Sequence, residues 1–594
     1  MLNYRLLSLS LIIVSAFNFV VAQTSDEKIK EKQKQQIALL EQIAKEAEGL
    51  RLAENRALAA AKLGDGFWKH DEKRARDFFQ VSVNELIQAQ IQAEANKKQY
   101  SALYSLVNGV SPRYEILMMI TAHDAEFALD AFYKSRPAKV AQALADTNGK
   151  KKSENQQFTY SEISFEQTLI NRVSEQSPQR ALKLLRESLK KGVTYEALSL
   201  IEKIRTKDLD VANQIAAEIA EKLMTADFEK DSQVFSLTAA FVAQYGKKSE
   251  TPEKAIKIDE KILRELTLKV AKNILDSEED GYFEIEYILP VIEKYAPETV
   301  AALKQKKAKY DKSNKREEYE AYNKFIESNP SPEKLLSEAD KFSDEFKNQI
   351  YYTAAEKAAQ NGNLAQAQKI IQSKLPEAEA ESYLTSINHN IISQATANGK
   401  FDEANALINE MPADNTRFYL LLSLATSIYQ KNPAENKKQS LGVVEQARAM
   451  IPQPAETLED MSSMVYLATV LAEIDSEQSF QIIESLVYPI NEFIEASAVV
   501  GKYRNDGTLR QGEMLVSNYG AVNGFSGVSP VITTIKNNDP KRTLDFINNF
   551  QRLEVRIGLQ MLLIDDSAPA DVSPSLSATP LIGITVNRRS MEKK

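Results

Sequence analysis

One pattern occurs twice in this chain, 37 residues apart. It begins with Asn-Gly and continues with a large apolar residue, an alanine and an aliphatic pair, in NGNLAQAQKII (361–371) and NGKFDEANALI (398–408). An apolar segment with helical spacing precedes each Asn-Gly. Glycine can adopt the left-handed backbone that ends one helix and turns the chain into the next, so we expect positive φ at Gly362 and Gly399. The pattern predicts consecutive helix–turn–helix units.

The alanines of the two units, Ala367 and Ala404, occupy positions where two helices have to approach closely, so we expect both to be buried. The placement of glycine and alanine over residues 350–430 resembles the tetratricopeptide repeat family. This resemblance implies an all-α fold, a right-handed α-solenoid of stacked antiparallel helix pairs.

A second pattern repeats near the N-terminus with an offset of 53 residues. HDEKRARDFF (70–79) and HDAEFALDAF (123–132) share His, Asp, Ala, Asp and Phe, and SPQRALKLL (177–185) repeats the alanine. Each segment opens with a residue that caps helix N-termini well, and these residues are Asp71, Asp124 and Ser177. We therefore expect a helix to begin at each of them.

Composition agrees with an all-α protein. The 594 residues include 19 Gly and 19 Pro, too few for the turns of an all-β protein of this length. A repeat array can reach this length without one large core, because each unit packs only on its neighbours. Residues 565–594 are rich in Ser, Pro and Ala and are predicted to form a disordered tail.

The repeats are expected in two regions, residues 23–296 and 332–564. The charged segment 297–331 between them is predicted to be a solvated bridging helix. Its lysines and tyrosines suggest a phosphate-binding surface as an alternative, but interleaved acids weaken it. Residues 505–528 are rich in glycine and contain the alternating segment GEMLV, which predicts an irregular loop with a small hairpin. The first helix, 24–50, is either a short coiled coil or a helix lying along the solenoid; its short apolar stripe favours the second.

The chain begins with a predicted signal peptide, residues 1–22. Arg5 precedes an apolar run, and small residues precede Gln23. A retained membrane anchor is the alternative, but the run is shorter than the roughly 20 apolar residues that a span needs. We expect an exported protein, periplasmic or secreted, without membrane insertion after cleavage. It has no cysteine, so disulfides are excluded.

The charge balance and the absence of several catalytic motifs argue against some classes of function. Acids outnumber bases, 83 to 74, which argues against a general nucleic-acid binder. The mature chain contains no Walker loop, GxGxxG, HExxH or GxSxG motif, and no cofactor is expected. With three His and no Cys, no zinc site is expected. His70 and His123 are interpreted as turn residues beside a cap, and His389 as a half-buried helix residue.

A dipeptide matches one enzyme family. Lytic transglycosylases carry a catalytic Glu in a Glu-Ser element, and Glu381-Ser382 matches it. The Gly-Leu-Met-Gln segment that accompanies the element in that family is missing here. No catalytic residue is therefore assigned.

The sequence predicts an exported, non-catalytic α-solenoid that binds protein or peptide partners as an envelope scaffold or adaptor. The alternative is an enzyme on an α-helical scaffold that acts on a cell-wall or polysaccharide substrate. Candidate partner-binding residues are polar or aromatic and flank the expected core positions Leu384, Ile387 and Ile391, or precede the next helix. They are Tyr383, Asn388, Asn390 and Arg417.

Overall fold

A computed structural model describes most of the chain between residues 30 and 564. The described residues are 30, 31, 33–95, 112–145, 156–228, 232–247, 255–277, 285–313, 316–504, 509–515 and 528–564. Of these residues, 82% are helical, which confirms the predicted all-α fold. The predicted signal peptide and C-terminal tail lie outside the described residues.

Contacts divide the chain into two units that differ from the predicted regions. The middle unit is Leu52–Glu381, and the end unit combines Met1–Arg51 with Ser382–Lys594. The boundary falls inside α20 (Glu377–Ala397). The boundaries drawn from the sequence remain predictions.

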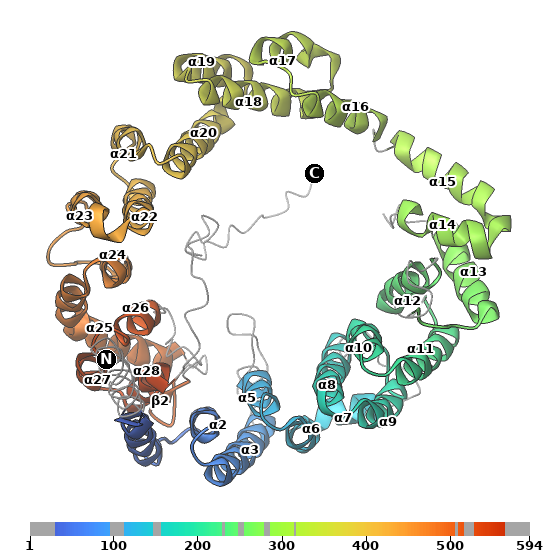
Figure 1. Cartoon of the computed structure of the whole chain (residues 1–594), viewed down its shortest axis with the longest axis horizontal. Coiled ribbons are helices and arrows are strands. Elements are labelled where there is room, and N and C mark those ends of the chain that lie inside the picture. The colour runs from blue at the N-terminus through green and yellow to red at the C-terminus, as the bar shows by residue number, and fades with distance from the viewer. Residues whose placement is uncertain are drawn as a thin grey trace, which may run out of the picture. The chain divides into compact units, whose positions relative to one another are not determined.

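The middle unit is built from helix pairs, shown from blue to yellow in Figure 1. Its helices are α2 (Ala53–Phe67), α3 (Glu72–Ala95), α5 (Pro112–Thr121), α6 (Ala125–Lys134), α7 (Ala138–Ala145), α8 (Gln156–Gln176), α9 (Pro178–Leu189), α10 (Tyr195–Arg205), α11 (Leu209–Met224), α12 (Ser232–Tyr245), α13 (Glu260–Asp276), α14 (Ile285–Tyr295), α15 (Val300–Ser313), α16 (Arg316–Glu327), α17 (Pro332–Glu338), α18 (Asp344–Gln360) and α19 (Leu364–Lys374), with 3-10 turns η2 (Pro297–Thr299) and η3 (Ala339–Lys341). Helix α8 packs beside α10 and α12 beside α14, while α9, α11, α13 and α15 follow one another in a second layer. This is the expected α-solenoid of stacked antiparallel helix pairs.

The segment predicted as one bridging helix forms two helices, α15 and α16. Tyr322 of α16 stacks on Phe346 at 5.1 Å and meets Phe342 edge-on at 6.3 Å. This tyrosine is therefore committed to packing.

The predicted caps near the N-terminus are confirmed. The side chains of Asp71, Asp124 and Ser177 accept hydrogen bonds from the backbone N–H three residues on, at 3.0, 2.9 and 3.3 Å. The alanines that share the 53-residue offset, at positions 75, 128 and 181, are all fully buried. The repeated residues thus do what helix initiation and close packing require.

A lysine cap recurs with an offset of 37 residues. Lys269 of α13 donates to the carbonyls of Leu223 and Met224 at the end of α11, at 3.2 and 3.0 Å. Lys306 of α15 donates in the same way to the end of α13, to Ile274 at 2.7 Å and Leu275 at 3.1 Å. The last carbonyls of a helix lack partners within it, so each lysine joins one second-layer helix to the next.

The turns of the two Asn-Gly units have the predicted geometry. Gly362 and Gly399 have φ of +83° and +72°. Ala367 and Ala404 are buried. The positive φ of Gly399 would strain any residue with a Cβ at this position. The glycine and alanine positions were therefore predicted correctly.

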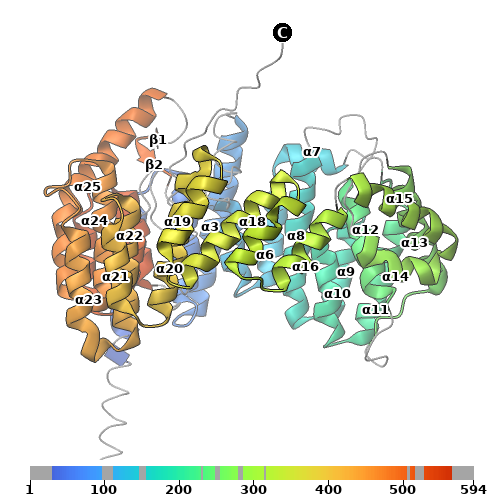
Figure 2. The same cartoon turned by 90° about the horizontal axis from the view of Figure 1, so that it is seen from above.

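The end unit contains α21 (Phe401–Glu410), α22 (Asn415–Lys431), α23 (Pro433–Arg448), α24 (Leu458–Ile474), α25 (Ser476–Arg504), α26 (Val528–Ile535), α27 (Pro540–Asn548) and α28 (Leu553–Ile564). Helices α22, α24 and α26 form one layer, and α23 and α25 pack against it (Figure 1). Figure 2 shows α22 to α25 from above. The predicted hairpin is present, with β1 (Leu509–Arg510) antiparallel to β2 (Glu513–Met514). Among the described residues, no helix combines the length and apolar character that a membrane span requires.

The first described helix packs against the last one. Residues 33–47 are helical and continue to Arg51, and we call residues 33–51 the N-terminal arm. Leu40, Ile43 and Leu50 of the arm are buried. An added Cβ at Gly49 would lie 2.8 Å from Leu553 of α28, so the arm and α28 are in close contact.

Polar contacts fix the arm in place. Glu46 pairs with Arg556 of α28 at 3.1 Å, and the Arg51 backbone N–H donates to both oxygens of Glu513 in β2 at 3.1 Å. Residues 460 or more positions apart therefore meet within the end unit. The sequence did not predict this junction.

Ala404 offers a test of packing. Ala404→Leu would insert a larger side chain into a fully buried position, and we expect it to destabilise the protein by about 1–3 kcal/mol. Urea unfolding followed by circular dichroism measures the effect. Ala397→Leu is a control at an exposed position on α20; an equal effect of both changes would contradict the packing assignment.

Candidate functional site

The predicted partner-binding residues lie in helices α20 and α22. Tyr383, Asn388 and Asn390 are half-buried residues of α20, and Arg417 lies in the first turn of α22. The Arg417 guanidinium donates to Asn409 Oδ1 at 2.6 Å and to the Met411 carbonyl at 3.4 Å, so it is turned toward the end of α21. Their role in binding stays a prediction.

The expected core positions of α20 are only partly confirmed. Ile387 is buried, whereas Leu384 and Ile391 are half-buried. The buried residue of the next turn is Ile392.

His389 is half-buried, as predicted, and its Nε2 has no hydrogen-bond partner among the described residues. Burial lowers the pKa of His389 below its ordinary 6.5, and nearby Asp414 opposes the shift. The unfolded chain then binds the proton more tightly, so the stability contributed by neutral His389 is present above pH 6.5 and is lost as the pH falls below it.

We expect the His389→Gln variant to lack the part of the pH dependence of folding stability that His389 contributes. Urea unfolding at pH 8.0 and at about pH 5.5 measures it, because the wild-type stability should fall more than that of the variant. His70→Gln is the matched control outside this helix. Equal falls in wild type and His389→Gln would contradict the assignment.

A surface rich in hydroxyl groups lies on α22 and α24, which pack side by side. The hydroxyl face consists of two stripes with helical spacing, all partly or fully exposed: Tyr419, Ser423 and Thr426 on α22, and Ser462, Tyr466 and Thr469 on α24. The rings of Tyr419 and Tyr466 meet edge-on at 5.0 Å, which places the stripes next to each other. The opposite sides of both helices carry buried Leu, Val and Ala that form the core of the end unit.

The tyrosines of the hydroxyl face keep their protons. Burial raises the pKa of Tyr419 and of Tyr466 above the ordinary value of 10.0. A neutral phenol can donate and accept hydrogen bonds, and its ring offers a flat surface for apolar or cationic groups. Tyrosine with small hydroxyl residues suits recognition of another molecule. A helical-wheel reading of 415–431 and 458–474 would have found each of the two stripes from the sequence, but not that they are adjacent.

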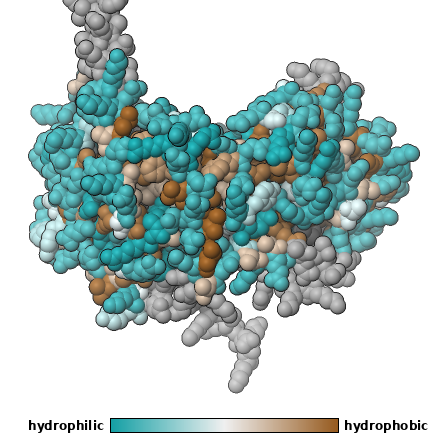
Figure 3. All heavy atoms as spheres, turned by 90° about the horizontal axis from the view of Figure 1, so that it is seen from below, coloured by the Kyte–Doolittle hydropathy of each residue, from teal (hydrophilic) through white to brown (hydrophobic). Residues whose placement is uncertain are grey.

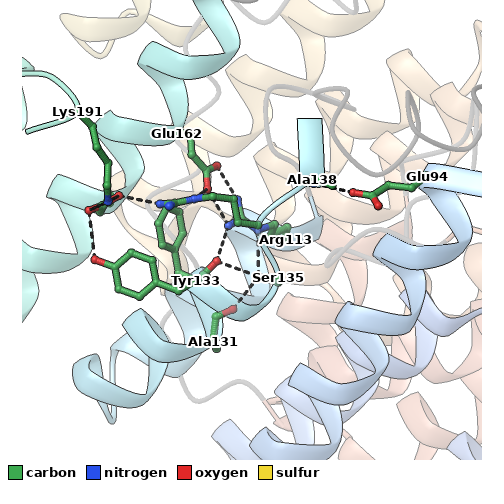
Figure 4. A network of polar contacts seen from close by, with 11 residues as sticks. Glu94, Arg113, Ala131, Tyr133, Ser135, Ala138, Glu162 and Lys191 are labelled. Atoms are coloured by element: carbon green, nitrogen blue, oxygen red, sulfur yellow. Dashed lines mark hydrogen bonds and ion pairs between the residues drawn. The ribbon is translucent and has the colours of Figure 1, made fainter. Parts of the chain in front are cut away.

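A buried charged network lies in the middle unit (Figure 4). Glu162 and Glu166 are one turn apart on α8, so both carboxylates lie on the same side of the helix. Arg113 of α5 binds both oxygens of Glu162 at 2.9 and 3.1 Å. Arg136, between α6 and α7, bridges Glu162 at 2.9 Å and Glu166 at 2.7 Å, and Lys191 binds Glu166 at 2.6 and 2.8 Å.

Further polar groups complete the network. Arg113 also donates to Ser135 Oγ at 3.0 Å and to the Phe132 carbonyl at 2.8 Å. The Tyr133 hydroxyl donates to Glu166 at 3.1 Å. Burial and the neighbouring carboxylate of Glu166 raise the pKa of Tyr133, so its phenol stays protonated. Arg113 is 4% exposed and the Glu166 side chain 0%.

The network has the properties of a structural element. Both carboxylates accept several hydrogen bonds, so neither has an exposed oxygen poised for proton transfer. It joins α5, the α6–α7 connection, α8 and the α9–α10 turn. We therefore assign it to packing.

His123 also has a packing environment. Its ring stacks on Trp68 at 4.7 Å and lies 5.8 Å from Phe79, and its Nε2 is 2.6 Å from Asp65 Oδ1. His123 lies in the turn between α5 and α6, as interpreted from the sequence. Glu381 and Ser382, the dipeptide shared with lytic transglycosylases, lie within α20. Among the described residues, no three His, Asp or Glu side chains are grouped so that they could hold a metal ion.

Comparisons with known proteins identify no family. No protein-family model and no curated protein matches the chain. One similar solved structure is a circular tandem repeat protein with novel repeat topology and enhanced subunit contact surfaces, with 12% identity, 89% of this chain and 96% of that chain covered, and a TM-score of 0.18. The helical-repeat fold of this chain therefore rests on its own helix pairs and their contacts.

Proposed function

We propose that this protein is an exported, non-catalytic α-solenoid that binds protein or peptide partners as an envelope scaffold or adaptor. The observation that supports it best is the hydroxyl face of α22 and α24. Stacking uses the apolar sides of these helices, and two tyrosines and four small hydroxyl residues remain partly or fully exposed. Stacked helix pairs present such surfaces as extended binding sites.

The surface seen in Figure 3 agrees with such a role. Polar residues cover most of this view, with smaller apolar patches between them. Isolated apolar side chains are ordinary on protein surfaces. We therefore expect polar and aromatic groups to determine which partner binds.

Capture from the native envelope fraction tests the proposal. The bait is the chain from residue 23 onward, and the test variant is Ser423→Lys with Ser462→Lys, which places two long side chains on the hydroxyl face. Ala434→Lys with Gln439→Lys adds the same charge to exposed positions of α23 and is the control. We expect the test variant to lose a partner that the bait and the control retain.

Two results would contradict the proposal. One is capture of the same proteins by all three baits, which would show that the hydroxyl face does not bind them. The other is turnover of peptidoglycan by the purified protein, abolished by a single Glu or Asp change, which would favour the enzymatic alternative.

A further inference from the structure

We infer that the hydroxyl face of α22 and α24 receives a polypeptide segment that carries lysine or arginine. This inference rests on the proposed function and names the chemistry of the partner. It depends on the hydrogen-bond direction, the charge and the aromatic rings of the face.

Three hydroxyl groups of the face have already used their protons and offer their oxygens as acceptors. Thr426, Ser462 and Thr469 donate their hydroxyl protons to the backbone carbonyls four residues earlier, at 3.0, 2.8 and 2.9 Å. The oxygen of each hydroxyl retains lone pairs that can accept a bond. A partner that brings donors, such as ammonium or guanidinium groups, satisfies these oxygens.

The charges beside the face are negative. Glu459 and Glu473 are exposed at the two ends of α24, in line with its hydroxyl stripe. Helix α24 contains no lysine or arginine. Both acids can therefore attract a cationic segment that lies along α24.

The basic residues of α22 are directed elsewhere. Arg417 donates to Asn409 and to the Met411 carbonyl, both at the end of α21. Lys431 Nζ lies 5.1 Å from the centre of the Phe401 ring, at the start of α21. Neither cation is directed at Glu459 or Glu473.

The paired tyrosines complete the complementarity. The edge-on arrangement of Tyr419 and Tyr466 leaves ring surface beside the acceptors. A lysine or arginine side chain can lie over a tyrosine ring while its charged end reaches a carboxylate. The face thus offers a site for the stem and a site for the charge of the same side chain.

Peptide binding to the full mature chain tests the inference. The probes are a fluorescein-labelled peptide of alternating lysine and glycine, and the same peptide with glutamine in place of lysine. Anisotropy titrations are done at low and at physiological salt. We expect the lysine peptide to bind and the glutamine peptide to bind at least tenfold more weakly, with affinity falling as salt rises.

Matched variants locate the binding. Glu459→Gln with Glu473→Gln should weaken the lysine peptide about 2- to 30-fold, the range for two exposed ion pairs. Glu435→Gln with Glu445→Gln changes the net charge equally on α23 and should leave the affinity unchanged. Thermal melting by circular dichroism verifies that both variants fold.

The outcomes separate this inference from the proposed function. Equal weakening by both double variants, or equal binding of the two peptides, overturns the cationic partner. Preference for a neutral chitooligosaccharide over the lysine peptide does so too. In each of these cases, the proposed function is still supported if a captured protein is lost when Ser423→Lys and Ser462→Lys are introduced. If no protein is captured but the peptides bind as expected, only the envelope role is contradicted.

Discussion

Arg113→Met is expected to destabilise the protein by about 3–5 kcal/mol, the loss that follows when one partner of a buried ion pair is removed. The change leaves Glu162 with Arg136 as its remaining cation, and it removes the donors to Ser135 and the Phe132 carbonyl. The groups left behind are buried, so water cannot replace the lost bonds freely. Urea unfolding followed by circular dichroism at neutral pH measures the loss.

A surface pair in the same unit provides the control. Arg180 of α9 pairs with Glu126 of α6 at 2.9 Å, and both side chains are about half exposed. Arg180→Met should cost no more than about 1 kcal/mol, because solvent screens an exposed pair. If Arg113→Met unfolds at the same urea concentration as Arg180→Met, the network does not stabilise the middle unit.

Removal of the N-terminal arm is expected to have the second large effect. A chain that begins at residue 52 exposes the surface around Leu553 and leaves Arg556 and Glu513 without the partners they have in the arm. Terminal elements of a repeat array need a cover, because the apolar side of the last helix otherwise faces water. We expect this chain to self-associate and to bind the dye ANS, whereas a chain that begins at residue 23 remains dispersed.

Size-exclusion chromatography with light scattering distinguishes the two chains. Glu46→Gln is a finer probe, because it keeps the arm and removes only the charge paired with Arg556. It should retain the size of the wild type. A dispersed chain that lacks residues 23–51 and melts at the wild-type temperature would show that the arm does not cover α28.

Local features of this structure could be predicted from the sequence, and long-range ones could not. The turn glycines and the caps at Asp71, Asp124 and Ser177 depend on residues within one or two turns, so a short pattern determines them. The pairing of Arg113 with Glu162 depends instead on how α5 and α8 pack. Many carboxylates in this acidic chain could have been chosen, and nothing near Glu162 in the sequence distinguishes it.

The candidate site was also predictable only in its local features. The polar stripes of α22 and α24 follow from helical spacing, but their adjacency was established by the contact of Tyr419 with Tyr466. The direction of the Arg417 side chain depends on the end of α21. It could not be inferred from its position before a predicted helix.

The contact between the arm and α28 implies that the chain could be circularly permuted. Glu46 and Gln560 are 3.5 Å apart, so the first and last described helices are neighbours although more than 500 residues separate them. A circularly permuted protein, with residue 23 linked to residue 594 and new ends opened in an exposed turn such as 361–363, should keep the same helix pairs. The helix pairs of this protein are therefore expected to form whichever turn of the array contains the first residue of the chain.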